Sequence, residues 1–398
     1  MVDTTTIRPE VDEILPGIIA DRRWLHENPE LGFQEFKTAE FVRQRLETLG
    51  VEDIQTGIAV TGVTGVIRGT GKGPGRNVLL RADMDALPMQ EENDVEYKSK
   101  TDGVMHSCGH DAHTAILLGV ARVLMERRDQ FSGAVKVLFQ PSEEANSGGA
   151  KPMIEAGVLN DPPIDAVFGL HMAAGNPTGE IRVGTGPIMA AADSYKIRIQ
   201  GRGGHAARPQ MAIDPVLIGM HIGVALQTIV SRNADPMDSL VISNCIFKAG
   251  DAGNIIPDTA YMEGTVRTFT PEMRDLAEER LTEIATSTAK MMGGEATVTY
   301  DRGYPATVND AEMADLVREA AAEVMGAENV KDRPPAMGAE DFSYFLLEKP
   351  GCFFNVGCRN EERGIVWGHH HPRFDVDEES LGHGVSVMTN TVLKYLNR

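Results

Sequence analysis

Cysteine is scarce in this chain of 398 residues, which contains only four, at irregular spacings. Small secreted proteins that rely on disulfide bonds carry cysteine at much higher density, so the sequence excludes a disulfide framework. The first residues also lack the basic segment and apolar core of a secretory signal peptide. We therefore expect a protein of the cytoplasm, where thiols remain reduced.

Positive charge is also in short supply, because 38 Lys+Arg stand against 58 Asp+Glu and give a formal net charge of −20. Binding to nucleic acid requires Lys and Arg clustered against the phosphates, and the sequence contains no such cluster. A third absence is that of an apolar run near the ~20 residues that a membrane-spanning helix needs. These absences predict neither nucleic acid nor a membrane as a partner.

The length of the chain exceeds what one ordinary hydrophobic core supports, so two domains are expected. Near-continuous apolar runs at residues 77–82, 134–139 and 166–170 are typical of strands buried on both faces of a mostly parallel sheet. Helical patterns over residues 10–50 and 114–127 would flank this sheet. The sequence therefore predicts an α/β fold for the first domain.

The succession of strand and helix patterns changes near Pro187, and this change predicts an inserted second domain. From there the patterns run strand, helix, strand, strand, helix, strand, at residues 194–200, 214–231, 239–247, 259–268, 270–292 and 296–300. This βαββαβ order is that of a ferredoxin-like domain. We therefore assign residues 1–187 and 304–398 to one discontinuous domain and residues 188–303 to the insertion.

A candidate metal site centres on Cys108 and His110, which lie two positions apart just before a helical pattern. Thiolate and neutral imidazole are the ligand types that borderline-soft divalent metals prefer. Further polar residues follow the three predicted strands: Asp83, Asp85, Glu143, Glu144 and His171. Because parallel strands present their carboxyl ends at one edge of the sheet, we expect all these side chains to meet there.

The number of candidate ligands favours two metal ions over one. The set comprises Cys108, His110, one of Glu143 and Glu144, His171, and one of His369, His370 and His371. A single tetrahedral zinc with an open water position needs fewer ligands, so two ions with a shared ligand fit better. Of the adjacent glutamates, one could bind a metal while its neighbour acts as general base toward a water molecule. Each residue alone has an ordinary structural explanation, and only their convergence is informative.

The inserted domain offers a second group of candidates, His205, Asn254 and Arg267. His205 lies in a glycine-rich segment, and a tight turn with an incidental histidine is one explanation. The other is a hydrogen-bond donor that stabilises a developing oxyanion. An arginine guanidinium is a natural partner for a substrate carboxylate.

Nine segments spread along the chain form a specific set of motifs: LHENPELGFQE (25–35), RADMDALP (81–88), MHSCGHDAHT (105–114), QPSEE (140–144), GLHM (169–172), GRGGHAARP (201–209), GNIIPD (253–258), GAEDFSYF (338–345) and HHPRFDVDE (370–378). This set resembles the metallopeptidase and aminoacylase family that includes hippurate hydrolase, N-acyl-L-amino acid amidohydrolases and auxin-conjugate (IAA-amino acid) hydrolases. The broader family commonly has His-x-Asp after the first strand. Asp83-Met84-Asp85 stands here instead, as in the hippurate-hydrolase branch with its cysteine-containing site.

The resemblance implies a site for two divalent metal ions per subunit, with zinc the first expectation and manganese, cobalt or nickel as alternatives. Its ligands would be Cys108, which would bridge the ions, together with His110, Glu144, His171 and His370. Glu143 would be the general base and acid. Asp85 would support a ligand without binding the ions, and His113 would not be a ligand.

The resemblance also implies roles for the inserted domain, which would act as a lid and as the contact surface of a homodimer or higher homo-oligomer. His205 would polarise the scissile carbonyl, in relatives often from the partner subunit. Asn254 and Arg267 would bind the carboxylate of the substrate.

The function that follows is metal-dependent hydrolysis of the amide bond of a small N-acyl-L-amino acid, which releases a carboxylate and an amino acid. One alternative is a dipeptidase or carboxypeptidase with the same site. The other is a non-catalytic binding protein in which the metals only stabilise the fold, and removal of the metals by a chelator would distinguish it.

Overall fold

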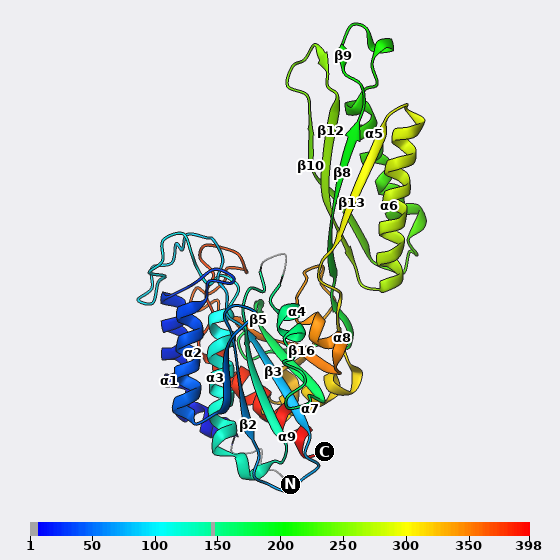
Figure 1. The fold of residues 1–398 in the computed structure, drawn as a ribbon. Helices are drawn as coiled ribbons and strands as arrows, with labels where there is room; N and C mark the ends of the chain where they lie inside the picture. Colours follow the sequence, from blue (N-terminus) through cyan, green and yellow to red (C-terminus); the bar gives the residue numbers. More distant parts are fainter. Residues whose placement is uncertain (1–6, 145–147) are drawn as a thin grey trace. The chain divides into compact units, whose positions relative to one another are not determined.

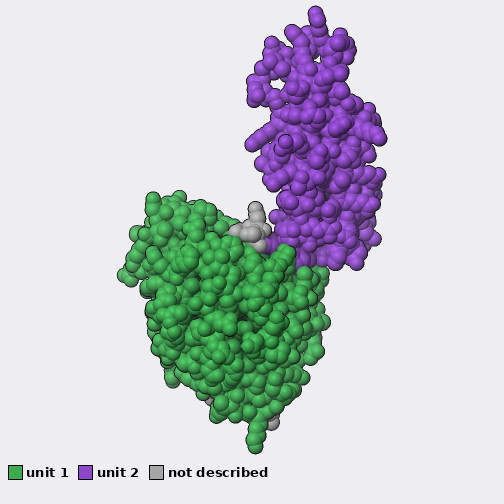
Figure 2. All heavy atoms as spheres, in the orientation of Figure 1, with its two compact units in different colours: residues 1–188, 308–334, 341–398 green, residues 189–307, 335–340 purple. Residues whose placement is uncertain are grey.

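The computed structural model describes residues 7–144 and 148–398. These residues form two compact units, which Figure 2 distinguishes by colour. Unit 1 runs to Ile188 and also contains Val308–Pro334 and Asp341–Arg398, whereas unit 2 contains Met189–Thr307 and Pro335–Glu340. The main segment of unit 2 is close to the expected insertion of residues 188–303.

The short segment Pro335–Glu340 differs from expectation, because it was assigned to the first domain and lies in unit 2. Backbone hydrogen bonds explain its place. The N–H of Ala190 donates to the carbonyl oxygens of Ala336 and Gly338, at 3.1 and 2.9 Å. Such pairing between segments far apart in the chain leaves no periodic signal in the sequence.

The centre of unit 1 is an eight-stranded sheet (Figure 1). Its strands, in spatial order, are β1 Glu52–Ile58, β2 Gly62–Arg68, β4 Ala134–Gln140, β3 Asn77–Asp83, β5 Ala166–Pro177, β16 Gly351–Arg359, β6 Ile181–Val183 and β15 Val330–Asp332. The neighbours β4, β3, β5 and β16 are parallel, so their carboxyl ends lie at the same edge. The predicted α/β fold with a mostly parallel sheet is confirmed.

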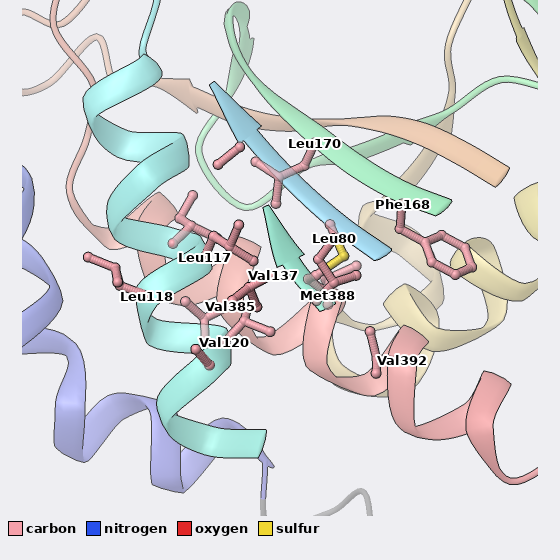
Figure 3. Close-up of a cluster of buried hydrophobic side chains, with 14 of the residues drawn as sticks. Leu80, Leu117, Leu118, Val120, Val137, Phe168, Leu170, Val385, Met388 and Val392 are labelled. Carbon is pink, nitrogen blue, oxygen red and sulfur yellow. The ribbon is translucent and has the colours of Figure 1, made fainter. Parts of the chain in front are cut away.

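Seven α-helices among the described residues belong to unit 1. They are α1 Ile7–Glu27, α2 Phe36–Leu49, α3 His110–Glu126, α4 Ala150–Glu155, α7 Ala311–Met325, α8 Ser343–Glu348 and α9 Glu379–Leu396. Residues of α1, α2, α3, α7 and α9 form one large hydrophobic core with the sheet. Figure 3 shows strand residues such as Leu80 and Val137 meeting Leu117 of α3 and Met388 of α9. Burial of each such side chain contributes about 1.5–3 kcal/mol, so α3 is held firmly above the strands that carry the polar residues.

Two element boundaries differ from the sequence-based expectation, and both concern the candidate site. Helix α3 begins at His110 instead of Thr114, so His110 lies in its first turn. Strand β5 continues to Pro177 because β16 pairs with it beyond the predicted end, with Asn355 opposite His171. His171 therefore lies within the strand and not after it.

Unit 2 consists of a four-stranded antiparallel sheet and two helices. In chain order they are β8 Ala191–Gln200, α5 Pro215–Thr228, β10 Leu240–Ala249, β12 Thr259–Thr268, α6 Pro271–Met291 and β13 Glu295–Arg302. The spatial order β10-β12-β8-β13 and the βαββαβ succession are those of the predicted ferredoxin-like fold. The shorter strands β9 Gly204–His205 and β11 Ile255–Ile256 pair within unit 2, whereas β7 Gly186–Met189 and β14 Thr307–Asn309 pair with each other and lie mostly in unit 1.

Helix α5 begins as its sequence predicts, because the side chain of Asp214 accepts the N–H groups of Val216 and Leu217. We expected no apolar run near the length of a membrane span. This expectation is wrong for Pro215–Asn233, which is long and apolar enough to cross a membrane, judged by length and composition alone. One face of this segment packs into the core of unit 2. Its other face is exposed and apolar, with Val224 75% exposed.

Candidate metal centre

The five predicted ligands of unit 1 come from four different segments. Cys108 and His110 lie at the start of α3, Glu144 follows β4, His171 lies in β5, and His370 lies in the loop between β16 and α9. The general base candidate Glu143 precedes Glu144 in the chain. These segments meet where the parallel strands end.

Among the described residues, five groups of side chains have ligand atoms within 4.8 Å of one another, and three of these groups consist only of the predicted ligands and base. The first is Cys108, His110 and His171; the second is Cys108, Glu144 and His370; the third is His110, Glu143 and Glu144. The structure thus brings together all five residues expected as ligands and the expected base. Cys108 belongs to the first two groups, which is the position that a ligand shared by two ions must occupy.

The histidines are oriented as metal ligands usually are. His110 donates Nδ1–H to the carbonyl oxygen of Asp85 at 2.9 Å, and His171 donates Nδ1–H to the carbonyl oxygen of Met172 at 2.6 Å. Among the described residues, the buried Nε2 of His110 has no hydrogen-bond partner. A ring held at Nδ1 with Nε2 directed elsewhere is the usual arrangement of a histidine that binds metal. The donor set of thiol, imidazole and carboxylate therefore fits two divalent ions such as zinc.

Burial shifts the pKa values of His171 and Cys108, whereas Asp83 and Asp85 outweigh burial at His110 and raise the pKa of its ring well above its usual value. Burial holds the pKa of the His171 ring well below its usual value, with further lowering by His113 and His369. His171 is therefore neutral and can offer a lone pair. Burial also raises the pKa of the Cys108 thiol well above its usual value. Metal binding at Cys108 must then release a proton, since only the thiolate is a good ligand.

Asp85 connects two of the segments that carry the site. One carboxylate oxygen accepts the N–H of Glu143 at 2.9 Å and the other accepts the N–H of Glu144 at 3.0 Å. The first of these oxygens also lies 3.2 Å from Nδ1 of His110. Asp85 is thus placed to orient His110 and both glutamates, as expected of a residue that supports ligands.

His113 lies close to Asp83 and His110, and these three could hold an ion by distance alone. Both ring nitrogens of His113 are already engaged, however. Nδ1 donates to Asp83 at 2.6 Å, and Nε2 accepts the N–H of Met172 at 2.8 Å. His113 therefore fastens α3 to β3 and β5, which agrees with its exclusion from the predicted ligands.

A buried charged network behind the site escaped the sequence analysis. The guanidinium of Arg22 donates to Asp111 and Asp375, each at 2.8 Å. The ring of His26 contacts Asp111 at 2.7 Å and Glu91 at 3.2 Å. The signal in the sequence was the presence of Arg22 and His26 on the apolar face of the first helix. A charged side chain on a buried face needs a partner of opposite charge. Because Asp111 follows His110, this network anchors the first turn of α3.

The candidates of unit 2 form one close pair and one distant residue. Strand β9, which contains His205, pairs with β11, and the N–H of Ala206 donates to the carbonyl oxygen of Asn254 at 3.1 Å. Nδ1 of His205 accepts the N–H of Ala207 at 3.1 Å, so the proton of the neutral ring lies on Nε2. His205 is exposed and can donate from Nε2.

Arg267 lies near the opposite end of β12 from this pair. In the register with β8, Thr259 is opposite Gln200 and Arg267 is opposite Ala192. At about 3.3 Å per residue, Arg267 is about 26 Å from the end of the strand near Asn254. The expectation that Asn254 and Arg267 bind one carboxylate therefore cannot hold within a single copy of unit 2.

Comparisons with known proteins agree with this geometry. The model of Peptidase family M20/M25/M40 matches residues 79–394. Thermostable carboxypeptidase 2 of Saccharolobus solfataricus is 42% identical over 98% of both chains. IAA-amino acid hydrolase ILR1-like 4 of Arabidopsis thaliana is 42% identical over 97% of this chain and 87% of its own. N-acetyl-L-cysteine deacetylase of Bacillus subtilis is 41% identical over 92% of this chain and 84% of its own.

A solved structure extends the comparison to three dimensions. The YXEP protein of Bacillus subtilis, described as a dinuclear metal binding peptidase of the M20 family, matches with a TM-score of 0.85 at 35% identity. The match covers 97% of this chain and 99% of that one. The likeness therefore extends over the whole fold, including the strands and helices that carry the candidate site.

Proposed function

Because this chain belongs to peptidase family M20/M25/M40 and is a metal-dependent amidohydrolase, we propose that it hydrolyses the amide bond of N-acyl-L-amino acids. The observation that carries the proposal is the position of Glu143 beside two ligand groups that share Cys108. Two relatives at 41–42% identity carry names that refer to N-acyl amino acids. The products would be a carboxylate and an amino acid.

Each proposed residue has one task in this reaction. Two divalent ions at the site, which we propose to be zinc, would polarise the amide carbonyl and lower the pKa of a water molecule. Glu143 takes a proton from the attacking water, a C–O bond forms and the C–N bond breaks, and Glu143 passes the proton to the departing amine nitrogen. The Nε2–H of His205 donates to the oxygen on which negative charge develops.

A carboxypeptidase or dipeptidase is the second candidate, because thermostable carboxypeptidase 2 is as similar to this chain as the IAA-amino acid hydrolase. The same groups would cleave both kinds of amide, and the acyl group alone differs. Steady-state kcat/KM values on hippurate, N-acetyl-methionine and a panel of dipeptides distinguish the two. A preference for dipeptides would contradict the proposed substrate class.

We also propose that the active form is a homodimer built through unit 2, in which one copy supplies His205 and Asn254 and the other supplies Arg267. The separation of about 26 Å along β12 supports this arrangement. Helix α5 presents exposed apolar side chains at helical spacing: Leu217, Met220 and Val224. Strand β10 beside it is an edge strand with unpaired backbone groups. A second copy of this face would cover both.

The substitution Glu143→Gln tests the catalytic assignment. The side-chain amide of the introduced glutamine cannot take a proton from water. We therefore expect kcat to fall by ~10²–10⁴-fold while the bound metal stays at its original stoichiometry. Glu144→Gln should lose metal instead, and Glu126→Gln, at an exposed position of α3, should change neither quantity. Metal content by atomic emission and initial rates on one N-acyl amino acid are the measurements. Full activity in Glu143→Gln would refute the role of general base.

A further inference from the structure

Glu35 is a carboxylate buried completely inside unit 1, and no task in the reaction has been given to it. Its two oxygens have different partners. Oε1 accepts the backbone N–H of Ser142 at 2.9 Å, and Oε2 accepts the hydroxyl of Thr61 at 2.5 Å. A carboxylate removed from water is costly unless such hydrogen bonds satisfy it, so its presence here calls for a reason.

Ser142, the partner of Glu35, immediately precedes Glu143 and has an unusual backbone conformation. Its φ of 55° lies in the left-handed region, which costs a residue with a side chain roughly 1–2 kcal/mol. Such a conformation persists only where surrounding contacts impose it. The hydrogen bond that the N–H of Ser142 donates to Glu35 is one of those contacts.

Two carboxylates together accept hydrogen bonds from three consecutive backbone N–H groups, those of residues 142–144, which we call the turn. Glu35 accepts from Ser142, while Asp85 accepts from Glu143 and Glu144. The peptide planes on both sides of Glu143 are therefore fixed in direction. The direction of a side chain follows from the backbone that carries it, so the two carboxylates determine where the carboxylate of Glu143 points.

The turn is also confined on its other side by Gly32, three residues before Glu35. A Cβ atom at Gly32 would lie 2.7 Å from Oγ and 3.2 Å from Cα of Ser142. The segment that carries Gly32 and Glu35 is itself tied to the end of β3, because the N–H of Ala86 donates to the carbonyl oxygen of Glu30 at 2.8 Å. Ser142 is thus enclosed between a glycine and a buried carboxylate.

We propose that Glu35 is a positioning residue for amide hydrolysis, which fixes the general base Glu143 through its hydrogen bond to the N–H of Ser142. This inference rests on the proposed function of the site. Glu35 acts by accepting a hydrogen bond and not by its charge. Burial raises the pKa of Glu35 to about 7, so both protonation states occur near neutral pH, and Oε1 can accept from Ser142 in either.

Three variants test the proposal on the metal-loaded full chain. Glu35→Ala removes the acceptor, and we expect kcat to fall 10–100-fold with KM and bound metal unchanged. Glu35→Gln keeps an oxygen for Ser142 and can donate to Thr61, so it should restore kcat to within about threefold of the parent. Gly32→Ala leaves Glu35 in place but displaces Ser142 from the opposite side, and it should also lower kcat.

Glu30→Ala is the matched control, because Glu30 in the same segment also accepts backbone N–H groups, those of Lys37 and Thr38, but none from the turn. It should leave kcat unchanged. Equal losses in Glu35→Ala and Glu35→Gln would overturn the proposal, as would an unchanged kcat in Glu35→Ala or a loss of metal in proportion to activity.

Amide hydrogen exchange at Ser142 gives a readout that does not depend on turnover. Exchange should be faster in Glu35→Ala than in the parent, and close to the parent in Glu35→Gln. If the parent protein hydrolyses none of the N-acyl amino acids or dipeptides, the proposed function fails, and exchange still decides whether Glu35 holds the turn. Unchanged exchange in Glu35→Ala would refute the inference even in an active enzyme.

Discussion

At the scale of single residues, His26 links the stability of unit 1 to pH. Burial and the nearby Arg22 favour the neutral ring, but the hydrogen bonds to Asp111 and Glu91 outweigh both and raise the pKa of His26 to about 9. An unfolded histidine titrates near 6.5. The charged ring therefore stabilises the fold fully below about pH 6.5, and this contribution disappears as the pH rises toward 9.

We expect His26→Gln to remove this dependence. Between pH 6.5 and 9 the parent should lose on the order of 3 kcal/mol of unfolding free energy more than the variant. Urea denaturation at several pH values, with metal present, measures the difference. His383→Gln is the control, since burial lowers the pKa of His383 to about 4 and its ring stays neutral throughout this range. Parallel pH profiles for the parent and His26→Gln would contradict the prediction.

The sequence could predict the residues of the site whose chemistry identifies them. Cys108 and His110 combine ligand types with a position before a helix, the paired glutamates follow a strand, and the structure brings them together. Glu35 differs, because its partner beside the site is the backbone N–H group of Ser142. Every residue but proline carries such a group, so nothing in the sequence indicates which one a distant carboxylate will accept.

At the scale of elements, the start of α3 depends on Gly109, which lies between Cys108 and His110. Its φ of 95° is in the left-handed region, and a Cβ there would lie 3.2 Å from Cβ of Met172. Gly109→Ala should therefore destabilise the protein by ~1–2 kcal/mol and also displace both ligands, which should weaken metal binding 10–100-fold. Competition with a chromophoric chelator measures the affinity.

Gly179→Ala separates the loss of stability caused by backbone strain from the displacement of the metal ligands. Gly179 has the same φ of 95° but no atom within 4 Å of the added Cβ, so only the backbone cost applies. Its stability should fall as that of Gly109→Ala does, while its metal affinity should equal that of the parent. Equal metal affinity in both variants would show that the loop does not place the ligands.

Most elements were predictable because their periodicity is strong and their caps are explicit. Helix α2 ends at Gly50 in the left-handed conformation, and α5 and α6 begin after Asp214 and Thr270. The ends of β5 and α3 were not predictable. Both depend on what they pack against, since β16 extends β5 and the ligand loop continues into α3 without a side-chain cap.

At the scale of the whole molecule, unit 1 and unit 2 have separate hydrophobic cores. All five proposed metal ligands belong to unit 1. We expect calorimetry to show two unfolding transitions, of which a chelator lowers only that of unit 1. Metal at a hundred times its dissociation constant would stabilise that unit by about 2.7 kcal/mol. An equal shift of both transitions would show that the units unfold together.

The proposed dimer makes a second prediction at this scale. Val224→Glu places a charge on the exposed face of α5 and should convert the dimer to an inactive monomer in sedimentation velocity. Leu347→Glu is the control, because Leu347 is also an exposed apolar residue, 66% accessible, but lies in unit 1. A dimeric Val224→Glu variant would contradict the assigned surface.

Mixing two inactive variants tests the exchange of residues between copies. Glu143→Gln retains His205, and His205→Ala retains Glu143, so a mixed dimer has one complete site of its two. Random exchange makes half of the dimers mixed, and about a quarter of the parent activity should return. No recovery after proven exchange would mean that each copy uses its own His205.

The position of β16 in the large sheet has a consequence for the order in which the protein can fold during synthesis. This strand lies between β5 and β6, yet it is made after the main segment of unit 2. Unit 2 can therefore complete its sheet on the ribosome while the large sheet still lacks an inner strand. His370 follows β16, so the last proposed ligand is also made after the main segment of unit 2. The proposed metal site can be complete only once His370 has been made, and a product truncated before this residue cannot form it.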